Sequence, residues 1–393
     1  MQWHEVCREW VQTQKKCSRH AGPDTHLQKE LTMKKSLALS ASAATLTALT
    51  LFGCGSVSDK TTAAPAAKDT LVAIYASTAP NMAAGAADPV WVNARPLTAD
   101  LTGGANFGSK PGEYNGETKV TLKAAYTADM LYMLIQYKDP TNSVRRMPYQ
   151  KQADGSWKKL VDPADKGGDD NMYYEDKWAM LWPTNEATAR LFDVKGCAMA
   201  CHLGQGKPYG NKYTNMPGLV LDMWHMKGIR TAPWGLVHDQ YTDDTQFDAK
   251  TAPNAGRKGD PGPSEYTGIN LVDGKPAFMN RDGKAANAGG TYYIKKGDEV
   301  PFDDSKFKAG DEVASIIINS QAGTDAGDVR TANGYADGVH TSVISRKLVT
   351  GSKFDVQFAD LGARYGFGFA AFDNAQVRHA TPDDPMYLTF GKR

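Results

Sequence analysis

Cys197, Cys201 and His202 form the one motif in the chain that carries specific chemistry, because residues 196–202 read GCAMACH. Two cysteines followed directly by a histidine are the arrangement that attaches c-type haem: the thiols add to the haem vinyl groups and the imidazole binds the iron. The usual gap between the cysteines is two residues, and here it is three. Since residues i and i+4 share a helical face much as i and i+3 do, the wider gap is feasible. The motif therefore predicts one covalently attached haem c.

The same side chains allow three other interpretations. Cys197 and Cys201 are suitably spaced for a disulfide over a tight loop in an oxidising compartment. They also suit a zinc site, which would want four ligands, usually from two Cys/His pairs. A haem bound without covalent attachment is the third alternative. Residue types and spacing leave these alternatives open.

A six-coordinate haem needs a second axial ligand, which is a histidine, a methionine or a lysine in most proteins. After the N-terminal segment described below, the histidines are His202, His225, His238, His340 and His379. His225 is flanked by Trp224 and Lys227, so we expect an indole that covers a haem edge and a cation that binds a propionate. His379 follows an alternating, strand-like run at 365–372. From the residues alone, both His225 and His379 stay open as the distal ligand.

The N-terminal segment reads as an export signal. From Met33 the chain has two lysines and then a stretch of 16 apolar and small residues, which is too short for a good transmembrane span and fits a secretory signal over 33–53. This stretch ends in LFGC, which resembles a bacterial lipobox, so we expect Cys54 to be acylated and residues 54–68 to form a flexible tether. An ordinary signal peptide with a chance cysteine is the alternative. Residues 1–32 precede a complete signal, and we interpret them as an unstructured gene-model extension.

Charge and composition narrow the class of protein. The net charge of +1 lacks the basic excess of a nucleic-acid binder, so no nucleic-acid partner is expected. At 41% hydrophobic residues the chain can bury a real core. The expected location is the cell envelope, as a periplasm-facing or outer-membrane lipoprotein held at the membrane by its lipid.

Residues 69–393 are predicted to form one all-β domain. The expected strands lie at 71–75, 119–126, 131–138, 178–182, 313–319, 342–349, 354–358, 365–372 and 386–390. The second and third of these are separated by a short polar break, which indicates a hairpin. Strands at close spacing on both sides of a long middle segment favour a β-sandwich of the immunoglobulin or carbohydrate-binding type. The segment 196–345 is rich in turn residues and is predicted to be a loop-rich, partly helical insertion that holds the haem.

Four segments together resemble the haem-binding domain related to the γ subunit of ethylbenzene dehydrogenase. They are the Cys/His motif, DMWHMKGIRTAP from 222, GVHTSVISRKLVTGSKFDVQF from 338 and YGFGFAAFDNAQVRHATPDDPMYLTF from 365. The resemblance covers roughly residues 70–393 and implies a β-sandwich with one haem between its loops. In the γ subunits the haem is b-type, with methionine and lysine on the iron. This chain offers His202 and His379 at the corresponding places, so the resemblance implies a c-type variant with these two as the axial pair and His225 as the runner-up.

The functional expectation is an exported monohaem cytochrome c-like protein that transfers electrons to and from redox protein partners. No Ser/His/Asp set or carboxylate pair argues for independent catalysis, so an enzyme is not favoured. One variant is an electron-transfer subunit of a periplasmic molybdenum oxidoreductase. A haem-based sensor or binding module is a second hypothesis, and a haem-free carbohydrate-binding or adhesive sandwich is a third.

Overall fold

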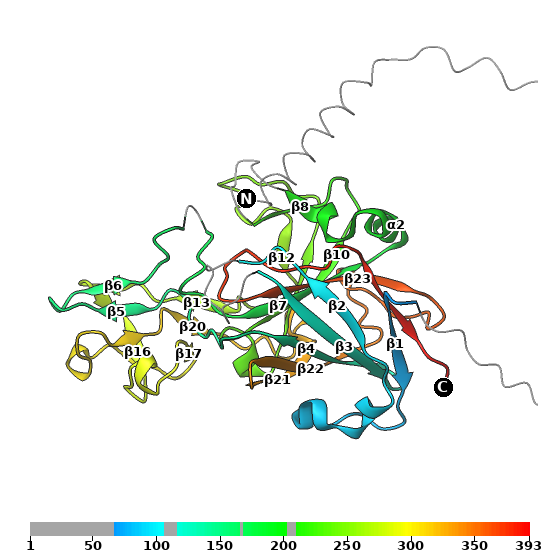
Figure 1. Ribbon diagram of the computed structural model, residues 1–393. Helices are drawn as coiled ribbons and strands as arrows, with labels where there is room; N and C mark the ends of the chain where they lie inside the picture. Colours follow the sequence, from blue (N-terminus) through cyan, green and yellow to red (C-terminus); the bar gives the residue numbers. More distant parts are fainter. Residues whose placement is uncertain (1–66, 106–115, 166–167, 203–209) are drawn as a thin grey trace, which may run out of the picture. The chain divides into compact units, whose positions relative to one another are not determined.

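The computed structural model describes residues 67–105, 116–165, 168–202 and 210–393, so Cys54 and the expected signal and tether up to residue 66 lie outside the described residues. Twelve strands join in one sheet (Figure 1). They are β1 (Thr70–Tyr75), β2 (Leu97–Leu101), β3 (Thr118–Tyr126), β4 (Met130–Lys138), β7 (Lys177–Pro183), β10 (Leu221–Lys227), β11 (His238–Thr242), β12 (Arg257–Gly259), β21 (Arg330–Ala336), β22 (Val339–Lys347), β23 (Tyr365–Phe372) and β24 (Met386–Phe390).

The sheet runs in the order β12-β11-β10-β7-β23-β24-β1-β3-β4-β22-β21, with β2 paired to β3 beside this path. β1 is parallel to both β24 and β3, and the other pairs are antiparallel. β23 joins the two halves, because Tyr365–Phe367 pairs with β24 while Gly368–Phe372 pairs with β7. The two halves face each other across a shared core, so the domain is a β-sandwich and the fold prediction is confirmed.

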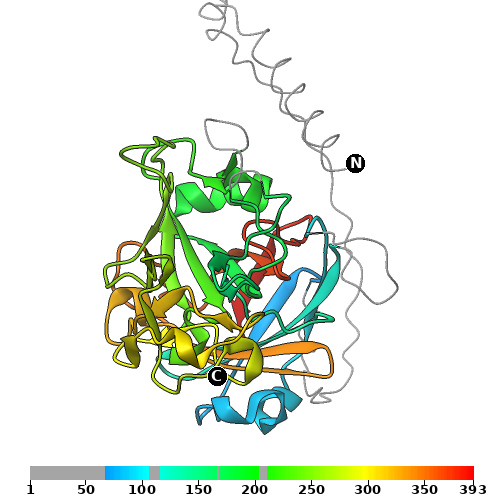
Figure 2. The same ribbon diagram turned by 90° about the vertical axis from the view of Figure 1, so that its left-hand side faces the viewer.

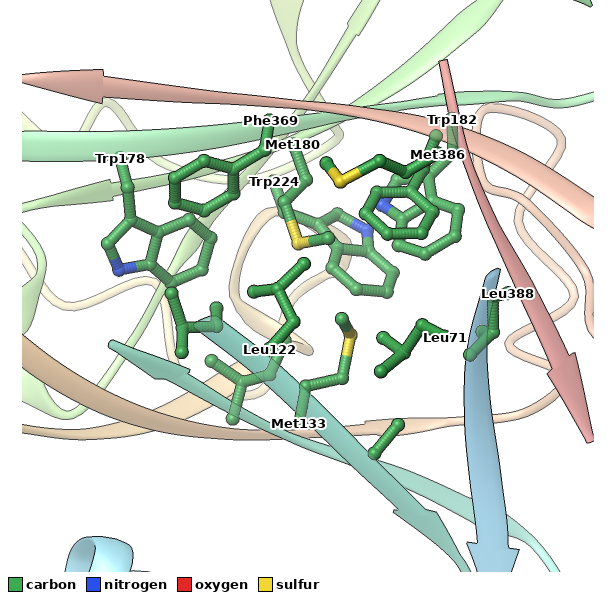
Figure 3. Close-up of a cluster of buried hydrophobic side chains, with 14 of the residues drawn as sticks. Leu71, Leu122, Met133, Trp178, Met180, Trp182, Trp224, Phe369, Met386 and Leu388 are labelled. Carbon is green, nitrogen blue, oxygen red and sulfur yellow. The ribbon is translucent and has the colours of Figure 1, made fainter. Parts of the chain in front are cut away.

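Aromatic side chains fill the space between the two halves. Figure 3 shows Trp178, Trp182 and Trp224 pointing from one half toward Leu122 and Met133 of the other. All five are fully buried, and the rings of Trp182 and Trp224 lie 4.9 Å apart. The indole Nε1 of Trp178 donates a hydrogen bond of 3.0 Å to Oγ of Ser342 on β22, which ties the halves together. Burial of such large side chains makes this the main stabilising region of the domain.

The opposite face of β7, β10 and β23 is also covered. All seven residues of β7 and all seven of β10 are buried, although alternate residues of a strand point to opposite faces. Two segments pack over this face, which we call the outer face. One is the helix α2 (Glu186–Lys195) with the 3-10 turn η3 (Gly196–Ala200), and the other is the chain reversal after β23. The candidate site lies under these two segments.

Shorter elements complete the domain. Two small sheets have three strands each: β19 (Glu312–Val313), β5 (Tyr149–Lys151) and β6 (Trp157–Lys159) in one, and β13 (Tyr266–Gly268), β20 (Ile316–Ile318) and β17 (Ile294–Lys295) in the other. Three further sheets have two strands each. They pair β14 (Leu271–Val272) with β15 (Lys275–Pro276), β16 (Phe278–Asn280) with β18 (Glu299–Pro301), and β8 (Cys201–His202) with β9 (Asn211–Lys212). The other 3-10 helices are η1 (Met82–Ala87), η2 (Pro89–Val92), η4 (Ala232–Trp234), η5 (Ala286–Ala288), η6 (Asp304–Lys306) and η7 (Asp325–Gly327). Most of the short strands form the yellow and orange lobe that faces the viewer in Figure 2. Among the described residues, no helix combines the length and the apolarity needed to cross a bilayer.

Most predicted strands match, and one does not exist. The run 354–358 alternates as a strand would, but it forms no strand: the N–H of Val356 donates to the Asp222 carboxylate and that of Phe358 to the Leu348 carbonyl. The predicted strand at 313–319 is divided between β19 and β20. The segment 196–345 contains long loops but also supplies β10, β11, β12, β21 and most of β22 to the main sheet. The sandwich frame therefore runs through the segment that was expected to be an insertion.

Candidate functional site

The Cys/His motif is presented by a helix end. Asn185 caps the start of α2, its side chain accepting from the N–H of Thr188, and Gly196 ends the helix with φ 52°. The positive φ suits glycine and turns the chain into η3, which carries Cys197. Cys201 and His202 follow in β8. The motif therefore spans a tight turn and the start of a short strand.

Cys197 lies directly against β23. A Cβ on Gly368 would lie 2.0 Å from the Cys197 sulfur, so only a glycine leaves room for this thiol. Burial, reinforced by the neighbouring Cys201, raises the pKa of Cys197 to about 12. Both cysteines are free thiols. The structure thus shows a half-buried, protonated thiol next to a second thiol and no disulfide between them.

Cys201 and His202 are held by β9. The Lys212 ammonium donates a hydrogen bond of 3.3 Å to the Cys201 sulfur. The His202 ring stacks on Tyr213 with 3.7 Å between ring centroids, and its Nε2 lies 3.0 Å from the Tyr213 carbonyl oxygen. Burial lowers the pKa of His202, so the imidazole is neutral at pH 7. A neutral imidazole is the form that binds a metal.

His379 is placed by the reversal after β23. Ala380 pairs with Ala371 through two backbone hydrogen bonds, and both alanines belong to the sandwich core. Because neighbouring residues of an extended segment point to opposite sides, His379 is directed away from the core, and its ring lies 4.8 Å from that of Phe372. From β7, the Lys177 ammonium donates to the carbonyl oxygens of Ala375 and Gln376, which holds the reversal in place.

The His379 ring is uncharged and has the tautomer that can bind a metal through Nε2. Its Nδ1 lies 2.7 Å from the Val377 carbonyl oxygen, a contact that places the ring proton on Nδ1 and leaves a lone pair on Nε2. Burial first, and then the positive charge of Lys212, lower the pKa of His379 to about 3. Lys212 also contacts Cys201, so the same cation is near both parts of the site. The structure therefore brings the Cys/His motif and His379 into one neighbourhood.

His225 lies on the same outer face. Its Nδ1 is 3.1 Å from Oε1 of Gln240, and its buried Nε2 has no hydrogen-bond partner among the described residues. The ring stacks on Phe372 at 5.7 Å, so His225 and His379 both contact this phenylalanine. Burial and the charge of Lys227 lower the pKa of His225 well below its ordinary value. An uncharged imidazole with an unused buried nitrogen is a second ligand candidate.

Trp224 requires a correction. We expected its indole to cover a haem edge, but Trp224 points into the sandwich core, where it packs on Trp182 and its Nε1 donates to Asp222. The reason is strand alternation: on β10, Trp224 and His225 must face opposite sides of the sheet. Lys227, two residues after His225, does share its face.

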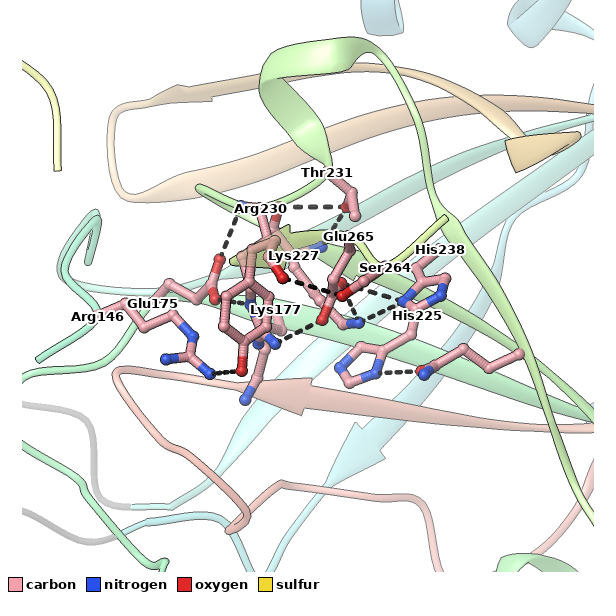
Figure 4. A network of polar contacts seen from close by, with 12 residues as sticks. Arg146, Glu175, Lys177, His225, Lys227, Arg230, Thr231, His238, Ser264 and Glu265 are labelled. Atoms are coloured by element: carbon pink, nitrogen blue, oxygen red, sulfur yellow. Dashed lines mark hydrogen bonds and ion pairs between the residues drawn. The ribbon is translucent and has the colours of Figure 1, made fainter. Parts of the chain in front are cut away.

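Lys227 belongs to a buried charged network (Figure 4). Its ammonium is bound to the Glu265 carboxylate and is 2.7 Å from Nδ1 of His238. Arg230 bridges Glu175 and Glu265. Burial lowers the pKa of Lys227 to about 7 in spite of the attraction of Glu265.

Arg257 adds a further cation to this network. It lies opposite Thr242 in the sheet, and its charge acts on both His225 and Lys227. It has no ion-pair partner within 4.0 Å among the described residues. Arg257 and Lys177 were not predicted as site residues, because strand pairing, and not sequence distance, brings them to the sheet that carries His225. The network carries more cations than carboxylates and suits an anionic group.

Between the thiols and the cations, the outer face carries short side chains. Ala179 is the register neighbour of His225, and Ala370 is the register neighbour of Ala179 on its other side. With Ala105 and Ala375 they form a cluster of small residues beside Phe372. Along the strands, the Cys197 thiol lies at Gly368, and His225 lies in the next row of outer-face residues with Ala179. Lys177 and Lys227 pair with each other in the row after that. A haem has its vinyl groups and its propionates on opposite edges, so this set of residues fits a haem c.

The domain is thus an all-β sandwich that places a thiol pair, histidines and buried cations on the outer face of one of its halves. The chain belongs to the family described as ethylbenzene dehydrogenase, whose model matches residues 88–383. This confirms the relation inferred from the sequence. No curated protein matches the chain.

Solved structures with a similar fold are distant. A family 9 carbohydrate-binding module from Caldicellulosiruptor kristjanssonii in complex with glucose is 10% identical, with 82% of this chain and 96% of that chain covered and a TM-score of 0.29. A carbohydrate-binding protein from Bacteroides uniformis, described as putative, is also 10% identical, with 82% and 98% covered and a TM-score of 0.30. Likeness at this level carries no argument about ligands.

Proposed function

We propose that this protein is an exported electron-transfer protein with one haem c, attached through Cys197 and Cys201 and ligated by His202 and His379. The observation that carries the proposal is the meeting of two free thiols and two neutral imidazoles around Lys212 on the outer face. When bound, the haem supplies a one-electron iron couple whose potential depends on its axial ligands and surroundings. The residues of the chain hold it, orient it and keep water away.

The two proposed iron ligands differ in whether their Nε2 atoms already have a hydrogen-bond partner. Nε2 of His379 carries the lone pair, since Nδ1 is bound to the Val377 carbonyl. Nε2 of His202 is engaged by the Tyr213 carbonyl, so coordination through this atom requires that contact to open. The rigid position of His379 next to the Ala371–Ala380 pair favours it over a residue of a long loop.

The cations at the far end suit the two carboxylates of a haem. Arg257 has no carboxylate of its own within ion-pair distance among the described residues, and Lys227 is only partly charged near neutral pH because of its burial. An anionic group placed beside them would favour their charged forms. We therefore assign Arg257 and Lys227 to the propionates, while His225 lies along the haem without binding the iron.

Membership in the ethylbenzene dehydrogenase family favours a partner that is itself an oxidoreductase. We accordingly propose that the electron partner is a periplasmic redox enzyme or carrier, including a molybdenum oxidoreductase of which this chain would be the electron-transfer subunit. A soluble redox protein at the cell surface would use the same haem in the same way.

The decisive experiment is a visible spectrum with a pyridine haemochrome assay on protein made together with a cytochrome c maturation system. We expect one haem per chain that resists acid–acetone extraction, is reduced reversibly and does not bind CO when reduced. A colourless protein would contradict the proposal in favour of a haem-free binding sandwich. A five-coordinate iron that binds CO or NO readily would favour a sensor.

Gly368→Ala is expected to lower haem attachment and to destabilise the domain by about 1–3 kcal/mol, because the new methyl group would overlap the Cys197 sulfur. Haem staining of denaturing gels and urea unfolding measure the two effects. Gly366→Ala is the matched control on the same strand, since its Cβ would meet Phe192 at an ordinary 3.4 Å. Full haem loading in Gly368→Ala would show that Cys197 does not lie against β23 during attachment.

We also propose that a lipid on Cys54 holds the protein at a cell-envelope membrane. Stable anchoring takes more than one acyl chain, and bacterial lipoproteins carry a diacylglyceryl group together with an amide-linked chain. Cys54→Ala should move the protein from the membrane fraction to the soluble periplasmic fraction. A variant that stays as membrane-bound as the wild type would rule out the lipid anchor.

A further inference from the structure

A second group of charged residues lies on the inner side of the sandwich and is not used by the haem site. Asp222 on β10 and Asp239 on β11 point to the face opposite to His225, as strand alternation requires. Asp355, in the segment that was wrongly expected to be a strand, meets them. All three carboxylates are at most 2% exposed. Ligand oxygens of the three lie within 4.8 Å of one another.

A second triad shares Asp355 with the first. It consists of Asp260, which follows β12, Asp325 of η7 and Asp355, again with oxygens within 4.8 Å of one another. Asp260 is 4% exposed, and neither of its carboxylate oxygens has a hydrogen-bond partner among the described residues. Asp260 is thus an independent, unpartnered buried side chain directed at the first triad.

Several carboxylate oxygens in this group of aspartates have no hydrogen-bond partner among the described residues. The buried carboxylate oxygens without a hydrogen-bond partner in the described part of the chain are Oδ1 of Asp222, Oδ2 of Asp239, both oxygens of Asp260, Oδ1 of Asp328 and Oδ1 of Asp355. A buried carboxylate oxygen without a partner is costly, and most buried polar atoms in folded proteins are satisfied. Six such atoms on neighbouring aspartates call for a bound cation or for protons shared between the carboxyl groups.

The protein supplies too little positive charge for these carboxylates. Arg346 is the cation that the described residues place within ion-pair distance, at 2.8 Å from Asp355, 3.6 Å from Asp222 and 4.0 Å from Asp239. One guanidinium cannot balance four buried aspartates. The carboxylates must therefore bind protons or a metal ion.

We propose that Asp239, Asp260 and Asp355, together with Asp222, Asp325 and Asp328, hold a calcium ion. Calcium takes six to eight oxygen ligands at about 2.3–2.6 Å and accepts irregular geometry, which matches an all-carboxylate set with oxygens less than about 5 Å apart. Zinc would need histidine or cysteine in the set, and magnesium retains several of its waters.

The ion would join segments that are far apart in the sequence. It would link β10 and β11 to the turn after β12, to η7 and to the segment that contains Asp355. Asp222 is three residues before His225, so the ion would also hold the strand that forms the floor of the haem site. This inference is independent of the haem, since no ligand is shared between the two sites.

Metal analysis and calorimetry on the full-length protein test the proposal. After removal of divalent ions with a chelator, titration with CaCl2 is expected to show one strong site, and the thermal midpoint should rise by about 4 °C at calcium one hundred times above Kd. Magnesium at the same concentration should have a much smaller effect. No binding of calcium by the chelated wild-type protein would overturn the proposal.

Variants locate the ion. Asp260→Asn and Asp239→Asn keep the side-chain shape and remove one charge, so each should weaken calcium binding by about tenfold or more. Asp139→Asn is the control, because Asp139 lies in a different buried group with Asp176 and His340, and it should retain the full calcium response. Unchanged affinity in Asp260→Asn would place the ion elsewhere and refute the assignment. If these variants fail to fold, the wild-type titration still decides whether calcium binds.

Discussion

Replacing both Cys197 and Cys201 by alanine is expected to abolish covalent haem while leaving the β-sandwich folded. The two thiols are the free cysteines of the described chain, and they stand at the surface of the sandwich half rather than in its aromatic core. Their removal costs little packing, since the neighbouring cluster around Phe192 and Met199 remains. Peroxidase staining of a denaturing gel should fall to background, and the far-ultraviolet circular dichroism should stay that of a β protein.

Single variants and a control sharpen this result. Cys201→Ala alone should leave one thioether, through Cys197, and hence a weaker band with a shifted haemochrome maximum. Ala198→Ser, an exposed change in the gap between the cysteines, should keep full attachment. Haem that is extractable from the wild type, or staining that persists in the double variant, would exclude the covalent assignment and leave a b-type haem as the alternative.

Replacing His379 by alanine is expected to convert a low-spin, six-coordinate haem to a high-spin form and to open the iron to CO. The ring of His379 is uncharged because burial lowers its pKa to about 3, and its Nδ1 is fixed on the Val377 carbonyl. Loss of this ligand leaves His202 alone on the iron. Optical spectra of the oxidised and reduced protein, with and without CO, measure the change directly.

His225→Ala tests whether His225 or His379 is the second axial ligand of the iron. This histidine contacts Phe372 as His379 does, but it lies beside the buried cations, where the haem periphery is expected. The variant should stay low-spin and mainly shift the potential. His340→Gln serves as a control at a histidine that is not assigned to the haem, because His340 is paired with Asp139 and Asp176. A high-spin iron in His225→Ala alone would transfer the axial role from His379 to His225.

The strands that alternate in the sequence are also the strands that the structure confirms. The runs at 119–126 and 131–138 form the β3–β4 hairpin, and those at 365–372 and 386–390 coincide with β23 and β24. The run at 354–358 shows why the rule has limits. The alternating pattern of this run reflects the burial of Val356 and Phe358. The N–H groups of these two residues, however, donate to a side chain and to a loop carbonyl, and not to a neighbouring strand.

The residues of the candidate site also fall into those that the sequence predicts and those that only strand pairing places. The spacing of Cys197, Cys201 and His202 is local and can be read directly from the chain, as can the presence of the further histidines His225 and His379. The side on which a residue of β10 points depends on register with β7 and β11, which is why Trp224 was assigned to the haem and proved to be core. Arg257 reached the site through pairing with Thr242, a contact that no local pattern signals.

The sequence by itself determined the all-β class, most strands of the frame, the family and the candidate haem-attachment motif, because these depend on side-chain alternation and on residues close together in the chain. Only the tertiary structure decided which residues share the outer face of β7, β10 and β23, and which aspartates gather around Arg346. The physical reason is that strand pairing and the fold of the sheet at β23 bring together residues more than a hundred positions apart. Burial in those places, rather than residue type, sets the charge of His379, Lys227 and Asp260.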